Sequence, residues 1–359
     1  MFKLEIFLFL AILLPSAILF GKSLKLKEEL VFYPSVGFLD SKKNKLILGI
    51  FGHVFEKKEN SRIRKIFIKL LQKYFNIENL SETEPIFRER LHWFLVDNQR
   101  SKKIKINFYN KIINMEKTKP NGKFITKLEI DPSLINPKDL KNGTLHYTAS
   151  LKSKDTRKIE GIIYLADKFE YIVFSDIDDT IKISDVRNKR ELLRNTFKRN
   201  MKPVEGMAEI YNKIANKKKT LFYYVSASPW QMYSLLYKFI NDFGFPTGLF
   251  GLKEFRLKDR NFFNLFKSPE KYKINRIEPI IKRFSNQKYI LIGDSGEKDP
   301  WIYHHLYQKY PDKIQFIFLR NAYPESNNKD IIDLYKDVPE EKWKLFINPL
   351  ELNSYLDKL

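Results

Sequence analysis

Apolar residues in the second half of the chain gather into four compact runs, at residues 171–175, 220–226, 288–293 and 313–319. Runs of this length are typical of strands that are buried on both faces of a parallel sheet. Helical spacing of apolar residues alternates with these runs, at residues 204–216, 230–243, 274–284 and 300–310. This alternation predicts an α/β domain with a doubly wound, Rossmann-type parallel sheet over residues 166–359.

The first half of the chain has a different pattern, in which short β-like segments are separated by polar stretches. The clearest of these segments lie at residues 45–52, 105–109, 123–130 and 143–150. One stretch, residues 63–75, instead spaces its apolar residues around the face of a helix. The pattern predicts a small β-sandwich domain over residues 24–165, interrupted by one helix.

The N-terminus carries an almost uninterrupted apolar run at residues 6–21, after Lys3. At roughly 1.5 Å per residue a helix of this length reaches about 24 Å, which is less than the ~30 Å of a hydrocarbon core. We therefore favour a cleaved signal peptide over residues 1–23, with the cut before Leu24, rather than a membrane anchor. The expected localisation is periplasmic or secreted, and the alternative is a membrane-anchored protein.

Basic residues outnumber acidic ones, with 65 Lys and Arg against 43 Asp and Glu and a formal net charge of +22. Such an excess favours anionic partners, for example an acidic membrane surface or a phosphorylated substrate. An ordinary solvated surface explains it equally well. The chain contains no Cys, which excludes thiolate catalysis, Cys-based zinc sites and disulfides.

Polar residues follow three of the four predicted strands, at the carboxyl ends where ligands bind in parallel sheets. Asp176, Asp178 and Thr180 follow the first strand in alternation. Carboxylates so close together repel, and a divalent cation is their natural neutraliser, although an acidic turn that caps a helix has the same pattern. Ser226 ends the second strand, where its hydroxyl could hold a phosphate oxygen or simply begin a helix.

The third strand ends in a Gly-bearing turn that contains Asp294 and Asp299. Two carboxylates there suit an oxygen-liganded hard cation, which favours magnesium over zinc. Lys271 and Lys273 begin the helical stretch before this strand. Either lysine could contribute to the site, and solvation is the default for a single lysine.

Together these motifs are more specific than any one of them. Asp-x-Asp-x-Thr after a first strand, Ser after a second, Lys at a helix start and Gly-Asp-x-x-x-x-Asp resemble the four motifs of haloacid dehalogenase-type phosphatases. Residues 174–182, 224–230 and 291–300 look like the catalytic domain of the actin-patch-associated phosphatidate phosphatases, which are distantly related to lipins. The resemblance covers about residues 165–325.

The resemblance implies a phosphatase that releases phosphate and diacylglycerol from phosphatidate through a phospho-aspartate. Asp176 would be the nucleophile, and Asp178 would protonate the leaving oxygen and later activate water. Lys273 would neutralise the phosphoryl charge, with Lys271 as the alternative.

The resemblance also implies the groups that bind substrate and metal. Thr180 would brace the catalytic loop and Ser226 would hydrogen-bond the phosphoryl group. The Mg²⁺ ligands would come from Asp176, Asp178, Asp294 and Asp299.

Partners would be phosphatidate or another phosphomonoester and, peripherally, an anionic membrane, and nucleic acid is not expected. Two alternatives remain open. One is a non-catalytic module that binds phosphatidate, and the other is a phosphatase of soluble phosphomonoesters or phosphoproteins. The presence of both Asp176 and Asp178 favours an enzyme, because a binding module has no need of both.

Overall fold

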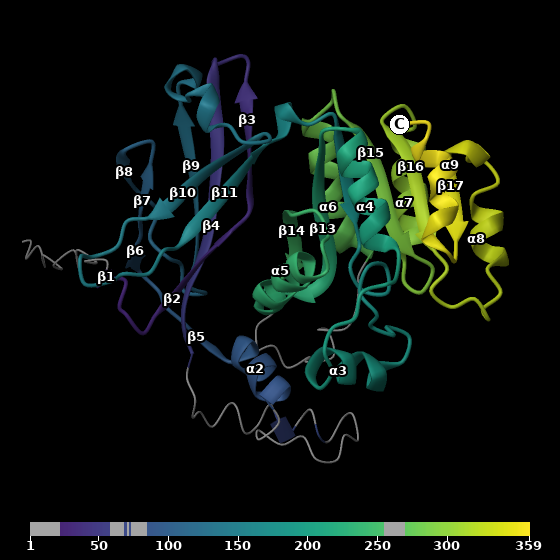
Figure 1. Cartoon of the computed structure of the whole chain (residues 1–359), viewed down its shortest axis with the longest axis horizontal. Coiled ribbons are helices and arrows are strands. Elements are labelled where there is room, and N and C mark those ends of the chain that lie inside the picture. Colours follow the sequence, from purple (N-terminus) through teal and green to yellow (C-terminus); the bar gives the residue numbers. More distant parts are fainter. Residues whose placement is uncertain (1–21, 58–67, 70–71, 73–84, 255–269) are drawn as a thin grey trace, which may run out of the picture.

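The computed structural model describes residues 22–57, 68–69, 72, 85–254 and 270–359. A β-rich part formed by the first half of the chain lies beside a mixed α/β part formed by the second (Figure 1). The apolar run at residues 6–21 and most of the predicted helix at residues 63–75 lie outside the described residues. Among the described helices, none is long and apolar enough to cross a membrane.

The β-rich part is built on one hydrogen-bonded sheet. Its strands are β2 (Glu29–Tyr33), β3 (Ser35–Asp40), β4 (Lys45–Lys57), β5 (Val96–Asn98), β7 (Lys105–Phe108), β8 (Lys111–Asn114), β9 (Lys123–Ile130), β10 (Thr144–Ala149) and β11 (Glu160–Leu165). The order is β2-β4-β3-β11-β10-β7-β8, and β5 and β9 also pair with the long strand β4. Most neighbours are antiparallel, but β3 and β11 are parallel. A separate short pair joins β1 (Lys22–Ser23) to β6 (Lys102–Lys103). This pairing does not by itself confirm the predicted sandwich.

The mixed part contains a six-stranded sheet in which every pairing is parallel. Its strands, in sheet order, are β14 (Gly248–Lys253), β13 (Thr220–Pro229), β12 (Tyr171–Ser175), β15 (Lys288–Asp294), β16 (Ile314–Arg320) and β17 (Trp343–Phe346). The four strands predicted from apolar runs are β12, β13, β15 and β16, and the predicted α/β class is confirmed. The edge strands β14 and β17 were not predicted.

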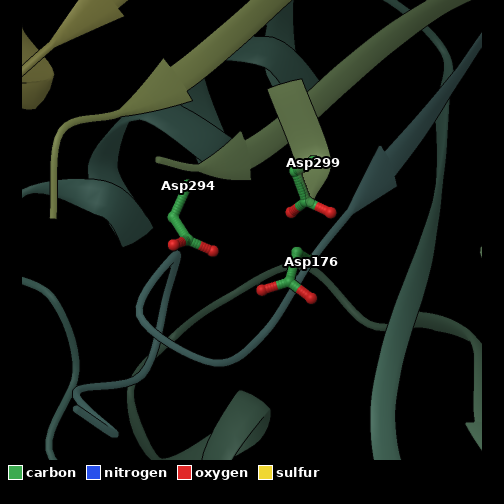
Figure 2. A group of neighbouring side chains, drawn as sticks. All are labelled: Asp176, Asp294 and Asp299. Atoms are coloured by element: carbon green, nitrogen blue, oxygen red, sulfur yellow. The ribbon is translucent and has the colours of Figure 1, made fainter. Parts of the chain in front are cut away.

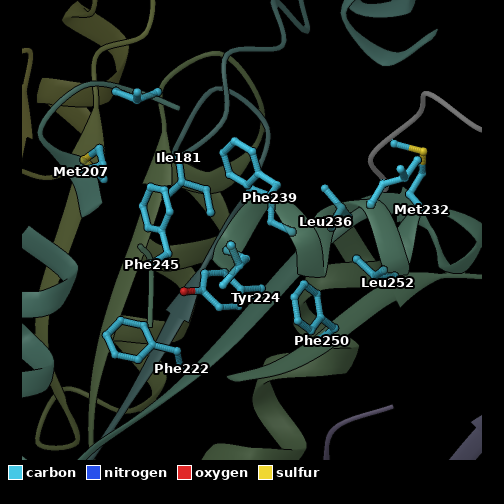
Figure 3. Close-up of a cluster of buried hydrophobic side chains, with 14 of the residues drawn as sticks. Ile181, Met207, Phe222, Tyr224, Met232, Leu236, Phe239, Phe245, Phe250 and Leu252 are labelled. Atoms are coloured by element: carbon cyan, nitrogen blue, oxygen red, sulfur yellow. The ribbon is translucent and has the colours of Figure 1, made fainter. Parts of the chain in front are cut away.

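Helices connect these strands and cover both faces of the sheet. The helices are α3 (Lys189–Phe197), α4 (Met207–Lys217), α5 (Tyr233–Asp242), α6 (Glu270–Arg283), α7 (Asp299–Lys309), α8 (Lys329–Leu334) and α9 (Asn353–Leu356). Successive strand residues enter opposite cores: Phe222 joins the core with α4 and α5, and Tyr223 joins the core with α6 and α7. Figure 3 shows part of the first of these cores, in which Phe222, Tyr224 and Phe250 lie in the same cluster as Phe239. This period of two is the physical reason that the central residues of β12, β13, β15 and β16 are mostly apolar on both faces.

The two parts share a continuous core. Helix α2 (Pro85–Phe94), which belongs to the first half of the chain, packs against α3 of the second half. The rings of Phe94 and Phe197 lie 5.0 Å apart. Arg90 of α2 donates hydrogen bonds to the carbonyl oxygens of Thr196 and Arg199. The carbonyls at the end of α3 are therefore capped by a side chain from the other half of the chain.

A second contact between the parts is aromatic. Tyr33 and Phe51 of the β-rich sheet pack against Trp230 and Tyr233, with the Tyr33 and Trp230 rings 4.5 Å apart. Trp230 begins a short 3-10 helix, Trp230–Met232, directly after strand β13. The β-rich sheet thus supports the segment that follows Ser226.

Candidate active site

Three buried aspartates meet at the carboxyl ends of the two central strands. Asp176 follows β12, Asp294 ends β15, and Asp299 begins α7. One carboxylate oxygen from each residue lies within 4.8 Å of the other two. Figure 2 shows the three carboxylates turned toward a common space. Because β12 and β15 are hydrogen-bonded neighbours, the fold itself brings these residues together.

Local hydrogen bonds fix the loop that carries Asp176. Its backbone N–H donates to the carbonyl oxygen of Ile292 in β15 at 2.8 Å. Thr180 donates a hydrogen bond from its hydroxyl to Oδ2 of Asp176 at 3.2 Å. Gly293 is required by a close approach, because a Cβ there would lie 2.3 Å from Oδ2 of Asp299.

Lys273 is the lysine that reaches the aspartates. Its Nζ lies 2.7 Å from Oδ1 of Asp176 and also bonds Oδ1 of Asp299. Lys273 is 1% exposed, whereas Lys271 is exposed. Burial lowers the pKa of Lys273, but the charges of Asp176 and Asp299 outweigh burial and raise that pKa well above its ordinary value. Lys273 is therefore a permanent cation within the cluster.

One lysine does not balance three buried carboxylates. Among the described residues, Oδ2 of Asp294 and Oδ2 of Asp299 are buried and have no hydrogen-bond partner. Burial, together with the neighbouring carboxylates, raises the pKa of Asp176 and of Asp294 well above the ordinary range. Buried oxygens without partners are costly unless a cation takes them up. A donor set made of carboxylate oxygens fits a hard cation such as Mg²⁺.

Asp178 lies in a different polar group from these three. Its Oδ1 is 2.7 Å from Nζ of Lys182 and accepts a hydrogen bond from Ser184. Its Oδ2 accepts hydrogen bonds from the hydroxyls of Ser226, at 2.9 Å, and Ser228, at 3.0 Å. Burial raises the pKa of Asp178, but Lys182 and the hydroxyls outweigh burial and lower the pKa to about 2. The carboxylate of Asp178, predicted as a fourth metal ligand, is thus not part of the three-aspartate cluster.

Comparison with known proteins finds one family model that matches part of this chain. Residues 171–321 match the family model described as the catalytic domain of phosphatidate phosphatase APP1. This segment, which is less than half of the chain, is similar to that catalytic domain. Every candidate site residue named above lies within the matched APP1-type segment.

Two fungal relatives match the same portion of the chain. Phosphatidate phosphatase APP1 of Saccharomyces cerevisiae is 36% identical over 152 residues, which cover 41% of this chain and 25% of the yeast protein. An uncharacterized protein of Schizosaccharomyces pombe is 29% identical over 155 residues, which cover 42% of this chain and 25% of that protein. The match therefore spans about a quarter of the length of the curated relatives.

The structure adds residues of the APP1-type domain that sequence reasoning left out. Lys182, Ser184 and Ser228 surround Asp178, as described above. The available signals were the four-residue spacing from Asp178 to Lys182 and the second serine after Ser226. Neither spacing is informative until the turn geometry of the loop is known.

Asp179, also left outside the predicted site, holds the catalytic loop in shape. Its backbone is left-handed, with φ of 56°. Its carboxylate accepts hydrogen bonds from the backbone N–H groups of Ser184, Asp185 and Val186 at 2.7–2.8 Å. Asp tolerates this conformation better than most residues, because its short side chain can satisfy nearby backbone groups.

A cavity next to Asp178 is lined on one side by apolar residues. The lining comprises Phe94, Asp178, Lys182, Val186, Leu192, Thr196, Ala227, Ser228, Pro229, Met232 and Glu297. Burial raises the pKa of Glu297 to about 7, against the opposing charge of Lys273. Phe94 belongs to α2, so the β-rich half contributes directly to the wall of the APP1-type site.

Proposed function

We propose that this protein is a magnesium-dependent phosphatase of the haloacid dehalogenase type that converts phosphatidate to diacylglycerol and phosphate. The observation that carries the proposal is the buried cluster of Asp176, Asp294 and Asp299, with two unpartnered oxygens and Lys273 bound to the Asp176 carboxylate. The APP1-type family of residues 171–321 supports phosphatidate as the substrate.

In the first step Asp176 attacks. One of its carboxylate oxygens bonds to phosphorus while the ester P–O bond breaks, and the lipid alcohol leaves with a proton. Lys273 balances the charge on the phosphoryl oxygens. Mg²⁺ held by Asp176, Asp294 and Asp299 would supply further charge neutralisation. We leave the Asp178 side chain out of this ligand set, because Lys182 and the serines already bind it.

Asp178 acts as the general acid in the first step and as the general base in the second. Before substrate binds, Asp178 is an anion. The negative charge of an entering phosphate raises the pKa of Asp178, because like charges repel. Asp178 can then take up a proton from solvent and pass it to the leaving oxygen. In the second step Asp178 takes a proton from the water that attacks phosphorus. The acyl phosphate bond breaks, phosphate leaves, and the Asp176 carboxylate is restored.

Two further features support a lipid substrate at a membrane. Phe94, Val186 and Met232 give the cavity beside Asp178 an apolar wall, which suits an apolar leaving group. The net charge of +22 favours contact with an anionic membrane surface. We also propose that the protein is exported, because the run at residues 6–21 is typical of a signal peptide.

Phosphate release tests the proposal. Wild type, Lys273→Met and Lys271→Met are compared on phosphatidate vesicles, lysophosphatidate and soluble phosphomonoesters, with and without Mg²⁺. Lys271 is the matched control, because it lies on the same helix but is exposed. We expect Mg²⁺-dependent turnover of phosphatidate that is lost in Lys273→Met and kept in Lys271→Met, with circular dichroism verifying that both fold.

Two outcomes would contradict this proposal and favour one of the alternatives. A higher kcat/KM for a soluble sugar phosphate than for phosphatidate would favour the soluble-substrate alternative. Binding of wild type to phosphatidate vesicles with no hydrolysis of any phosphomonoester would favour the non-catalytic module.

A further inference from the structure

A separate cavity of about 440 Å³ lies where the β-rich sheet meets the edge of the parallel sheet. Its walls come from β3, β4 and β9 on one side and from β13, β14 and α6 on the other. Among the described lining residues, none belongs to the aspartate cluster or to the polar group around Asp178. Its volume falls within the ~300–1,000 Å³ of small-molecule sites, which often lie between domains.

Most of the cavity wall is apolar. Val36 contributes from the β-rich sheet, and Leu249 and Ile280 contribute from the opposite side. Leu249 lies at the start of β14 and Ile280 lies late in α6, which puts both toward the amino ends of the parallel strands. The apolar wall therefore extends away from the end of the sheet that carries the aspartates.

The charged lining residues gather at the other end. Trp230 directly follows β13 and Glu254 directly follows β14, so both lie toward the carboxyl ends of the strands. Lys123 has a side chain that is 11% exposed, and its Nζ lies 2.6 Å from Glu254 and 5.1 Å from the centre of the Trp230 ring. Lys119 and Arg276 also line the cavity.

These charges do not balance. Lys119, Lys123 and Arg276 face a single described carboxylate, Glu254, whose side chain is 56% exposed. Lys123 is largely buried, so an anion placed beside it would gain more than it would at the surface. An apolar cavity with an excess of cations at one end is complementary to a ligand with an apolar chain and a negative head.

We propose that this cavity binds a single acyl chain with an anionic head group, at a site distinct from the aspartate cluster. The chain lies along Val36, Leu249 and Ile280, and the head group bonds Lys123 and Arg276. Fatty acids and lysophosphatidate share this chemistry. The inference goes beyond the proposed hydrolysis and does not depend on it.

Trp230 provides a direct reading of occupancy, because it lines the cavity. Bromine-labelled stearate, added below its micelle concentration, should quench the fluorescence of the full chain saturably, and Trp230→Phe should lose that quenching. Unlabelled oleate and lysophosphatidate then compete, and displacement by one or both identifies the head group. The methyl ester of the probe has the same chain without the charge and should bind more weakly.

Variants test the two ends of the cavity. Lys123→Gln should weaken stearate binding by about tenfold or more, the loss expected for one charge-assisted hydrogen bond. Lys127→Gln is the matched control, because Lys127 lies on the same strand with a side chain that is 58% exposed. Val36→Phe fills the apolar part and should weaken the acid and its ester alike. Asp176→Asn should bind stearate as wild type does.

Saturable quenching that survives both Lys123→Gln and Val36→Phe would overturn the proposal, as would the absence of saturable quenching in the folded wild type. Loss of quenching in Asp176→Asn would assign the ligand to the catalytic cluster and overturn it as well. A protein that binds stearate but hydrolyses no phosphomonoester would contradict the proposed function and leave this inference intact.

Discussion

Asp294 has a buried carboxylate oxygen with no partner among the described residues. We therefore expect the stability of the protein to depend on a metal ion bound at this residue. Saturation with Mg²⁺ at about a hundred times its dissociation constant should stabilise wild type by about 2.7 kcal/mol. Asp294→Asn removes a charge from a repelling cluster, so the metal-free variant should be more stable than metal-free wild type and gain little from Mg²⁺. Thermal unfolding with Mg²⁺ or chelator measures both effects. Equal stabilisation of Asp294→Asn and of the exposed control Asp312→Asn would contradict the metal site.

His53 should make stability depend on pH. Burial, with Lys123 nearby, lowers the pKa of His53 to about 4, from about 6.5 in the unfolded chain. Between these values the unfolded state binds more protons, so stability is complete above pH ~6.5 and falls on the order of 3 kcal/mol as pH drops toward ~4. Denaturant titrations at several pH values should show this loss of stability in wild type and in the exposed control His146→Gln, but not in His53→Gln. The same pH dependence of stability in His53→Gln as in wild type would show that His53 is not its cause.

Sequence patterns led to the aspartates of the site but not to their surroundings. Asp176, Asp294 and Asp299 could be grouped because each stands at the carboxyl end of a recognisable strand or the turn after it. The partners of Asp178 could not be predicted in this way, because Lys182 and Ser184 reach Asp178 only through the turns of the catalytic loop. Contacts made by irregular backbone carry no periodic signal.

Strands and helices were predictable where packing leaves a regular pattern. β12, β13, β15 and β16 are covered on both faces, so most of their residues are apolar and form recognisable runs. β14 contains Gly248 and Gly251 within six residues, and β17 is a four-residue edge strand that is only partly buried, so neither produces such a run. Helix α2 was missed, since its apolar face is defined by contact with α3 far along the chain.

Docking of α2 should be essential for stability. Phe94 is 2% exposed and packs on Phe197, so Phe94→Ala should lower the free energy of unfolding by about 3–5 kcal/mol. Phe243, which is 39% exposed at the end of α5, is the control, and its replacement by Ala should cost much less. Denaturant titration of both variants measures the difference. Equal losses would mean that α2 is not docked on α3.

The two halves of the molecule should depend on each other. Trp230 and Tyr233 pack against Tyr33 and Phe51 across the boundary predicted at residues 165 and 166. Residues 166–359 produced alone should therefore unfold at a lower temperature than the full chain and bind an apolar dye, because those rings become exposed. Scanning calorimetry and dye fluorescence compare the two proteins. A fragment as stable as the full chain, with no dye binding, would show that the halves are independent.

For the molecule as a whole, we predict that Asp176 becomes phosphorylated during turnover. Asp178→Asn should keep the nucleophile but slow the attack of water, since general base catalysis contributes about 10²–10⁴ in rate. With an activated aryl phosphate, whose leaving group needs little protonation, this variant should accumulate phosphorylated protein. Acid quenching and peptide mass analysis in the presence of Mg²⁺ should then find an acyl phosphate on Asp176, and Asp176→Asn should be inactive. Full Mg²⁺-dependent hydrolysis by Asp176→Asn would show that Asp176 is not the nucleophile.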